Sequence, residues 1–202
     1  HQFPANIFNA MIYPIRPYGI RGIIWYQGER NSKDAAQAFH YRGQLAKLIS
    51  YYRSTWHKLS GGHVAKDFPF QFTQLPSWNP PQAKPVEELE ATWVVNREAM
   101  RLVANEVPNT ALAVSIDTGD AITLHPKNKK PIGLRHAYLA LQKTYGKKIP
   151  ADGPRHQGGG RAQVHPLPSR QVEDRWQCRH RFLVIPGDTY QTHQGFPLGL
   201  VA

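Results

Sequence analysis

Apolar positions along the first 150 residues follow two different spacings that alternate. Short β-favouring runs that each lead into a loop occur at residues 22–26, 68–75 and 111–117. Longer stretches with apolar residues three and four positions apart, as in amphipathic helices, follow at 33–56, 88–105 and 131–145. This order predicts an α/β fold, a three-layer α/β/α sandwich with a parallel sheet. Ligands of such sheets bind at the carboxyl ends of the strands.

Each helical stretch has one apolar face that we expect to be buried. In the first stretch the larger apolar residues of this face are Tyr41, Leu45, Leu48, Ile49, Tyr52 and Trp56. In the second they are Trp93, Met100 and Val103, and in the third they are Leu134, Tyr138, Leu141 and Tyr145. Ser32 is expected to cap the start of the first helix, and Gly146 to end the third.

The last 52 residues differ in composition from the rest of the chain. They contain no lysine, whereas the first 150 residues contain eleven, and they show no periodicity until residues 182–185. We therefore divide the chain into a domain at 1–150 and an atypical tail at 151–202. Three interpretations of the tail stay open: a β-rich appended module, a flexible or disordered segment, or a frame-shifted translation, which the abrupt change favours.

Charge and cysteine content exclude some classes of function. The 25 Lys and Arg against 14 Asp and Glu give a net charge of +11, which could attract nucleic acid. The cations are scattered, however, and the tightest run is Lys127, Lys129 and Lys130, so we expect no nucleic-acid partner. The single cysteine, Cys178, excludes an intrachain disulfide and a cysteine-rich zinc site. No apolar run approaches the roughly twenty residues of a membrane span.

Candidate chemistry follows the first predicted strand, in a loop that reads Gln27-Gly28-Glu29. A side-chain amide and backbone N–H groups at the carboxyl edge of a sheet are suitable donors for an oxyanion. The alternative is a glycine turn that leads into a capped helix, with Gln27 and Glu29 solvated.

A second candidate loop follows the third predicted strand. His125 lies there, downstream of Asp117 and Asp120. An imidazole that takes a proton, beside a carboxylate that fixes its tautomer, is the arrangement that acyl transfer needs. The alternative is a structural histidine, since the chain has nine others.

Several sequence blocks together resemble one family. They are Gly22-Ile-Ile-Trp-Tyr-Gln-Gly-Glu29, Phe68-Pro-Phe-Gln-Phe-Thr-Gln-Leu75, Trp93 with Arg97-Glu-Ala99, Pro108-Asn-Thr110, and Asp117 through Lys129. In order and spacing they are similar to the sialate O-acetylesterase family of SGNH-type hydrolases. The resemblance covers residues 7–150 and leaves the tail uncovered.

The resemblance implies an α/β/α SGNH fold, flavodoxin-like, and hydrolysis of O-acetyl esters on sugars such as sialic acids, with no metal or organic cofactor. A serine would attack the acetyl carbonyl, and His125 would act as general base and then acid. Gln27 and backbone amides near Gly28 would bind the oxyanion, and Glu29 would orient or polarise them. Arg30, Asn31 and Trp78 are candidate substrate contacts, and family members are often secreted or periplasmic.

Three departures from the family pattern affect these expectations. The Gly-Gln-Ser-Asn block of the nucleophile is absent, so we expect an N-terminally truncated domain whose serine comes from a missing upstream segment. Ser32, Ser77 and Ser115 read as structural. Thr123 stands where relatives carry an acid two residues before the histidine, and Asp120 is the nearest carboxylate that could substitute. Arg30 replaces the usual serine and places a cation at the expected rim.

Two classes of function follow from the residues and the resemblance. The first is a carbohydrate O-acetylesterase domain that is active only when joined to its serine block. The second is a catalytically degenerate glycan-binding domain that retains the cleft without a competent triad.

Overall fold

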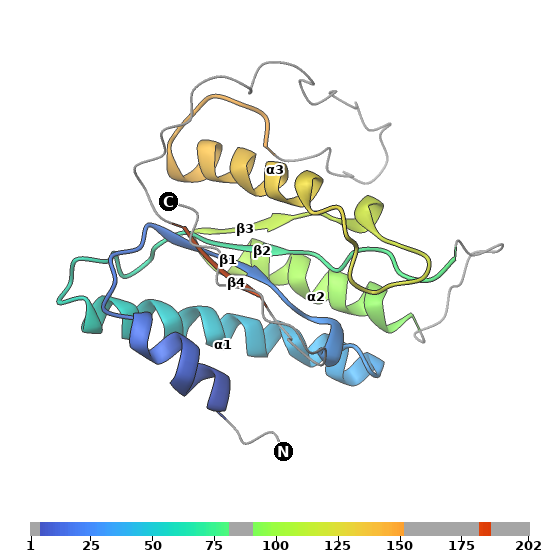
Figure 1. The fold of residues 1–202 in the computed structure, drawn as a ribbon, viewed down its shortest axis with the longest axis horizontal. Helices are drawn as coiled ribbons and strands as arrows, with labels where there is room; N and C mark the ends of the chain where they lie inside the picture. The colour runs from blue at the N-terminus through green and yellow to red at the C-terminus, as the bar shows by residue number, and fades with distance from the viewer. Residues whose placement is uncertain (1–4, 81–90, 152–181, 187–202) are drawn as a thin grey trace.

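The computed structural model describes residues 5–80, 91–151 and 182–186 (Figure 1). Its sheet has the strand order β3-β2-β1-β4, and every neighbouring pair is parallel. The strands are β1 (Gly22–Tyr26), β2 (Phe70–Thr73), β3 (Thr110–Ala113) and β4 (Phe182–Pro186). The helices α1 (Ala35–Leu59) and α2 (Thr92–Glu106) cover one face, and α3 (Lys130–Leu139) covers the other. The predicted three-layer α/β/α sandwich is confirmed.

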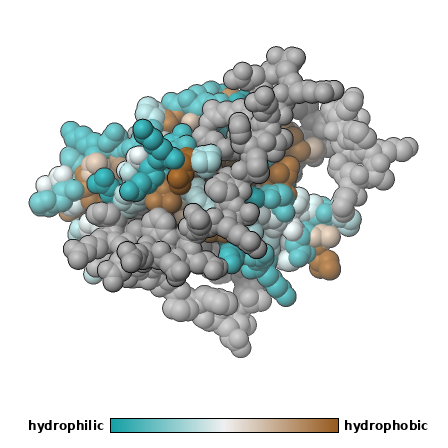
Figure 2. Space-filling model, turned by 90° about the horizontal axis from the view of Figure 1, so that it is seen from above, coloured by the Kyte–Doolittle hydropathy of each residue, from teal (hydrophilic) through white to brown (hydrophobic). Residues whose placement is uncertain are grey.

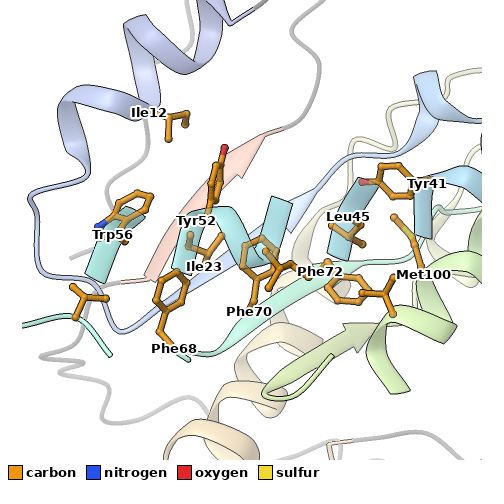
Figure 3. Close-up of a cluster of buried hydrophobic side chains, with 13 residues drawn as sticks. Ile12, Ile23, Tyr41, Leu45, Tyr52, Trp56, Phe68, Phe70, Phe72 and Met100 are labelled. Atoms are coloured by element: carbon orange, nitrogen blue, oxygen red, sulfur yellow. The ribbon is translucent and has the colours of Figure 1, made fainter. Parts of the chain in front are cut away.

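The sequence of β2 shows why the sheet is buried on both faces. Its side chains alternate, because successive residues of a strand point to opposite faces. Phe70 and Phe72 are fully buried in the cluster that α1 and α2 form, beside Tyr52 and Met100 (Figure 3). The intervening Gln71, also buried, faces α3.

The first helix begins later than predicted and has a different cap. Asp34 is the N-cap, and its side chain accepts a hydrogen bond from the N–H of Gln37 at 2.8 Å. Ser32 is instead buried, and its Oγ donates to the carbonyl of Gly28 at 3.1 Å. The expected cap at Ser32 is therefore wrong, because a short 3-10 turn (Glu29–Asn31) separates β1 from the helix.

The expected inner faces of α2 and α3 also need correction. Trp93 is only half-buried, although Met100 and Val103 are in the core as predicted. In α3 the buried residues are Ile132, His136 and Leu139. Leu134, predicted to point inward, is 39% exposed. The error arises because a buried histidine holds the central position of that face, and hydrophobic periodicity cannot detect it.

Several boundaries differ from those that the pattern predicts. Both β2 and β3 are shorter, and β3 gives way to a 3-10 turn (Ile116–Thr118). The third helix passes into a π-helical turn (Ala140–Thr144) before Gly146, which has φ of +64° and suits a helix end. The predicted start of the second helix at residue 88 lies outside the described residues. Two short turns, Phe8–Ile12 and Tyr13–Ile15, precede β1.

Residues 182–186 of the tail form β4, which pairs with β1 over the whole length of both strands. The periodicity noted at 182–185 thus belongs to a strand of the same sheet. The remaining tail residues, Cys178 among them, lie outside the described part of the chain.

Candidate active site

Three loops leave the sheet at the carboxyl ends of adjacent strands β1, β2 and β3, at the right of the molecule in Figure 1. The loop after β1 carries Gln27, Gly28 and Glu29, and the loop after β2 carries Trp78. The loop after β3 carries Asp120 and His125. Because the strands are parallel and adjacent, residues scattered over 99 positions of sequence gather at one edge of the sheet.

The side chain of Gln27 is held at both ends. Its Nε2 donates to Asn31 Oδ1 at 2.8 Å, and its Oε1 accepts from the buried hydroxyl of Tyr41 at 2.9 Å. The same hydroxyl accepts from Trp25 Nε1 at 3.0 Å. Asn31 Nδ2 in turn donates to Gln44 Oε1 at 2.9 Å. A chain of hydrogen bonds thus fixes the amide of Gln27 and leaves one of its two N–H bonds for another acceptor.

Gly28 occupies a position that other residues would not fit. Its φ of +157° with ψ of −12° is a conformation that L side chains rarely adopt. A Cβ there would also lie 3.1 Å from Met100 Cε and 3.3 Å from Asn96 Oδ1. The N–H of Gly28 donates to Glu29 Oε2 at 3.0 Å. The backbone amide expected to bind an oxyanion is therefore engaged by the neighbouring carboxylate.

Asp120 stabilises its own loop. Its Oδ1 accepts from the N–H groups of Ile122 and Thr123 at 2.8 and 3.0 Å. These two bonds, above all the one from Ile122, hold the pKa of the half-buried Asp120 below its usual range. The other upstream acid, Asp117, forms two hydrogen bonds with Arg135 at 2.6 and 2.5 Å, which lower the pKa of Asp117. Both carboxylates that precede His125 thus have local structural partners.

His125 is exposed, and its backbone N–H donates to Thr123 Oγ1 at 3.1 Å. Among the described residues, no hydrogen bond joins its imidazole to Asp120 or to the loop after β1. The structure brings Gln27, Gly28, Glu29 and Asn31 into direct contact but leaves His125 on a separate loop.

Lys129 connects the two loops. Its Nζ donates to the hydroxyl of Tyr26 at 3.1 Å and lies 4.5 Å from the centre of that ring. Burial raises the pKa of Tyr26 to about 12, and the nearby charge of Glu29 adds to the shift. Burial lowers the pKa of Lys129, and Glu29 opposes this. Sequence reasoning missed this contact because the two residues are 103 positions apart.

The candidate substrate contacts lie in different environments. Arg30 is exposed, whereas both ends of the Asn31 carboxamide bind neighbouring amides. Trp78 is 41% exposed and forms an isolated β-bridge with Asp120. On the face seen in Figure 2, the described residues show hydrophobic surface as small patches among hydrophilic ones.

Two surface hollows lie near opposite ends of the strands. One is at the carboxyl end of β1 and is lined by Trp25, Gln27, Asn31, Tyr41, Gln44, Leu45 and Leu48. The other contains Arg53, His57 and Lys66. Arg53 binds the carbonyls of Pro108 and Asn109, just before β3, so this second hollow is remote from the three loops. The first hollow is the one that adjoins the candidate residues.

A family model described as carbohydrate esterase, sialic acid-specific acetylesterase, matches residues 5–140. The chain belongs to this family. The match includes all three loops, and it ends before the tail.

Individual relatives agree with the family. The sialate O-acetylesterase of Mus musculus is 31% identical over 146 residues, which are 70% of this chain and 27% of the mouse protein. That of Homo sapiens is 29% identical over 153 residues, 73% of this chain and 29% of the human protein. A crystal structure of a carbohydrate acetylesterase from Xanthomonas citri matches with a TM-score of 0.64 and 32% identity, covering 76% of this chain and 33% of that one. The chain thus spans about a third or less of the length of these relatives.

Two absences hold for the residues that the structure describes. No group of three or more His, Cys, Asp or Glu side chains there could hold a metal ion. No helix in the same part of the chain is long and apolar enough to cross a membrane.

Proposed function

We propose that this chain supplies the histidine and the oxyanion-binding side of a carbohydrate O-acetylesterase that hydrolyses O-acetyl esters on sugars such as sialic acids. The observation that carries the proposal is the convergence of three loops, all within the family match, at the carboxyl edge of β1, β2 and β3. A serine from a segment outside this sequence would complete the site.

In the proposed reaction the serine hydroxyl attacks the acetyl carbonyl while His125 takes its proton. His125 then gives this proton to the sugar oxygen as the ester bond breaks, which releases the sugar and leaves an acetyl-serine. Water, deprotonated by His125, hydrolyses that intermediate to acetate and restores the serine. The exposure of His125 is compatible with access to both the ester and water.

We assign the main oxyanion contact to the free N–H of Gln27. Tyr41 and Asn31 fix its amide, and a donor that is already in place needs no reorganisation during the reaction. The N–H of Gly28 would become available only after it leaves Glu29 Oε2. Glu29 would therefore polarise the N–H of Gly28 in the resting state and release it when an oxyanion forms.

Asp120 remains our proposal for the acid that orients His125. One of its oxygens holds the loop through Ile122 and Thr123, so the other oxygen would have to contact the imidazole. The substitution Asp120→Asn tests this, because an amide oxygen can keep the loop bonds while the negative charge is lost.

At the rim, Arg30 would attract a carboxylated sugar, because its guanidinium can bind a carboxylate with two hydrogen bonds. Asn31 would act on the substrate mainly through Gln27, to which its side chain is bonded.

A second candidate is a catalytically degenerate glycan-binding domain. The observation in its favour is the position two residues before His125, where the hydroxyl of Thr123 accepts a backbone hydrogen bond instead of a carboxylate orienting the imidazole. Loss of the orienting acid can lower turnover by about ten-thousandfold in a triad hydrolase.

The deciding experiment compares hydrolysis of p-nitrophenyl acetate and of an O-acetylated sialic acid by this chain and by a version extended upstream to include the serine block. We expect activity in the extended version that His125→Ala abolishes, while His40→Ala, a change at another exposed histidine, leaves it intact. Activity that survives His125→Ala would refute the assigned role of this histidine. No activity in either version would favour the glycan-binding alternative.

A further inference from the structure

Trp78 and Trp93 form an aromatic pair next to the candidate site. Their ring centroids are 5.5 Å apart and their planes are inclined by 34°. Trp78 comes from the loop after β2, and Trp93 from the first turn of α2. Neither residue is in the core, since Trp78 is 41% exposed and Trp93 is half-buried. The pair therefore presents indole surface to solvent.

The loop that carries Trp78 is fixed from the side of α2. Arg97 Nε donates to the carbonyl of Leu75 at 2.9 Å, and Arg97 Nη2 donates to that of Pro76 at 2.8 Å. Burial lowers the pKa of this guanidinium, which nonetheless stays charged. The two bonds hold the backbone just before Trp78 in one position.

The same loop is fixed from the side of the His125 loop. The N–H of Asp120 donates to the carbonyl of Ser77 at 3.3 Å, and the N–H of Ser77 donates to that of Ile116 at 3.3 Å. The two backbones approach so closely that a Cβ on Gly119 would lie 1.9 Å from the Ser77 oxygen. Only glycine fits there, and Trp78 is thereby held beside the loop that carries His125.

We propose that Trp78 and Trp93 form a subsite for the sugar ring of the acetylated substrate. This proposal rests on the proposed function, and it adds Trp93 and the position of the sugar relative to the acetyl group. The apolar face of a pyranose ring would stack on the indoles while its ester points toward His125. A platform that is rigid before binding loses little conformational entropy when the ligand arrives.

The size of the platform favours a sugar ring over a protein partner. A stable protein interface buries about 800 Å² on each side. A tryptophan side chain can bury roughly 150–250 Å² of surface. Part of this area is already buried here, because the two indoles contact each other. Such a small aromatic area suits one or two sugar rings.

Saturation-transfer NMR and calorimetric titration with the 202-residue chain test the proposal. The probes are the methyl glycoside of N-acetylneuraminic acid, xylotriose, and glycerol as a polyol without a ring. We expect saturation of ring protons for at least one sugar and none for glycerol. Trp78→Ala and Trp93→Ala should each weaken that binding roughly tenfold, the ratio that corresponds to 1.4 kcal/mol. Val94→Ala, at a 56% exposed neighbour on α2, is the matched control and should leave it unchanged.

Phenylalanine variants at both positions keep an aromatic face and serve as controls for misfolding of the alanine variants. Circular dichroism checks that each variant is folded. They should bind more tightly than the alanine variants. Sugar binding that is equal in wild type and in both alanine variants would overturn the proposal, as would the absence of sugar binding in the wild type. The esterase assay of the extended version separates the two proposals: sugar binding that depends on Trp78 and Trp93, without ester hydrolysis, would support this subsite and refute the proposed function.

Discussion

The hydroxyl of Tyr41 lies between the indole N–H of Trp25 and the side-chain oxygen of Gln27, at 3.0 and 2.9 Å. It therefore links the core face of α1 to the loop that follows β1. Tyr41 is 4% exposed, so most of its side chain packs against other residues of the chain.

Tyr41→Phe should therefore destabilise the chain by about 1–3 kcal/mol, because it leaves the Trp25 donor and the Gln27 acceptor without their partner. Urea unfolding followed by tryptophan fluorescence measures the change. Tyr51→Phe removes the same atom from a residue on α1 that is 48% exposed, and it should change the free energy of unfolding by less than about 0.5 kcal/mol. Equal effects of the two substitutions would contradict the role assigned to the Tyr41 hydroxyl.

His136 predicts how stability depends on pH. Burial between β2 and α3 lowers the pKa of His136 to about 4, from the ordinary value of 6.5. Its Nε2 lies 2.8 Å from Thr73 Oγ1, and the Gln71 amide nitrogen can donate to its Nδ1 at 2.9 Å. As pH falls below 6.5 the unfolded chain binds a proton at this residue that the folded chain does not bind until about pH 4. The free energy of unfolding should thus decrease by about 3 kcal/mol as the pH falls from 6.5 to about 4. Below about pH 4, His136 should cause no further decrease.

The measurement is a series of urea titrations between pH 4 and 7 in the wild type and in His136→Gln. The variant should be less stable at pH 7 and should show a flatter dependence on pH. His40→Gln, at an exposed histidine on α1, should retain the wild-type slope. A slope that His136→Gln leaves unaltered would show that another group causes it.

Arg53 joins the amino ends of two strands. Its guanidinium donates to the carbonyls of Phe68, Pro108 and Asn109 at 3.0, 2.9 and 2.8 Å. Arg53→Lys should cost about 2–3 kcal/mol in the free energy of unfolding, because one ammonium cannot reach all three oxygens and the buried carbonyl of Phe68 can lose its donor. Arg42→Lys, which alters the exposed pair with Glu106, should cost less than about 1 kcal/mol. Thermal unfolding of both variants tests the difference.

The spacing of apolar residues and the order of the elements along the chain are enough to predict some features of the fold. The bounds of β1 and most of the inner face of α1, from Tyr41 to Trp56, follow directly from the apolar pattern. The gathering of Gln27, Trp78 and His125 at one edge follows from parallel strands in sequence order.

Contacts between distant side chains could not be predicted in this way. The inner face of α3 depends on hydrogen bonds from His136 to β2, and a hydrophobic pattern counts that histidine as polar. Asp34 and Ser32 are both good capping residues, and only the turn after Gly28 decides between them. The spacing of apolar residues predicts that Trp93 is in the core, and only the structure shows that it contacts Trp78 in a surface loop.

The contact between Lys129 and Tyr26 leads to the last prediction. Lys129 lies four residues after His125, and Tyr26 immediately precedes Gln27, so this contact holds the two candidate loops together. Lys129→Met should raise amide hydrogen exchange in residues 120–128 by about fivefold, which corresponds to the loss of about 1 kcal/mol from a hydrogen bond and a cation–π contact.

Lys129→Arg should restore most of the protection, because a guanidinium can also contact the ring and the hydroxyl of Tyr26. Tyr26→Phe removes only the hydrogen bond and should have an intermediate effect. Lys130→Met makes the same change of charge one residue away and should leave exchange in residues 120–128 as in the wild type. If Lys129→Met and Lys130→Met behave alike, the contact does not hold the His125 loop. If they differ as expected, Lys129 holds the loop of His125 to that of Gln27, and the same substitution in an active, extended version should lower kcat more than it raises KM.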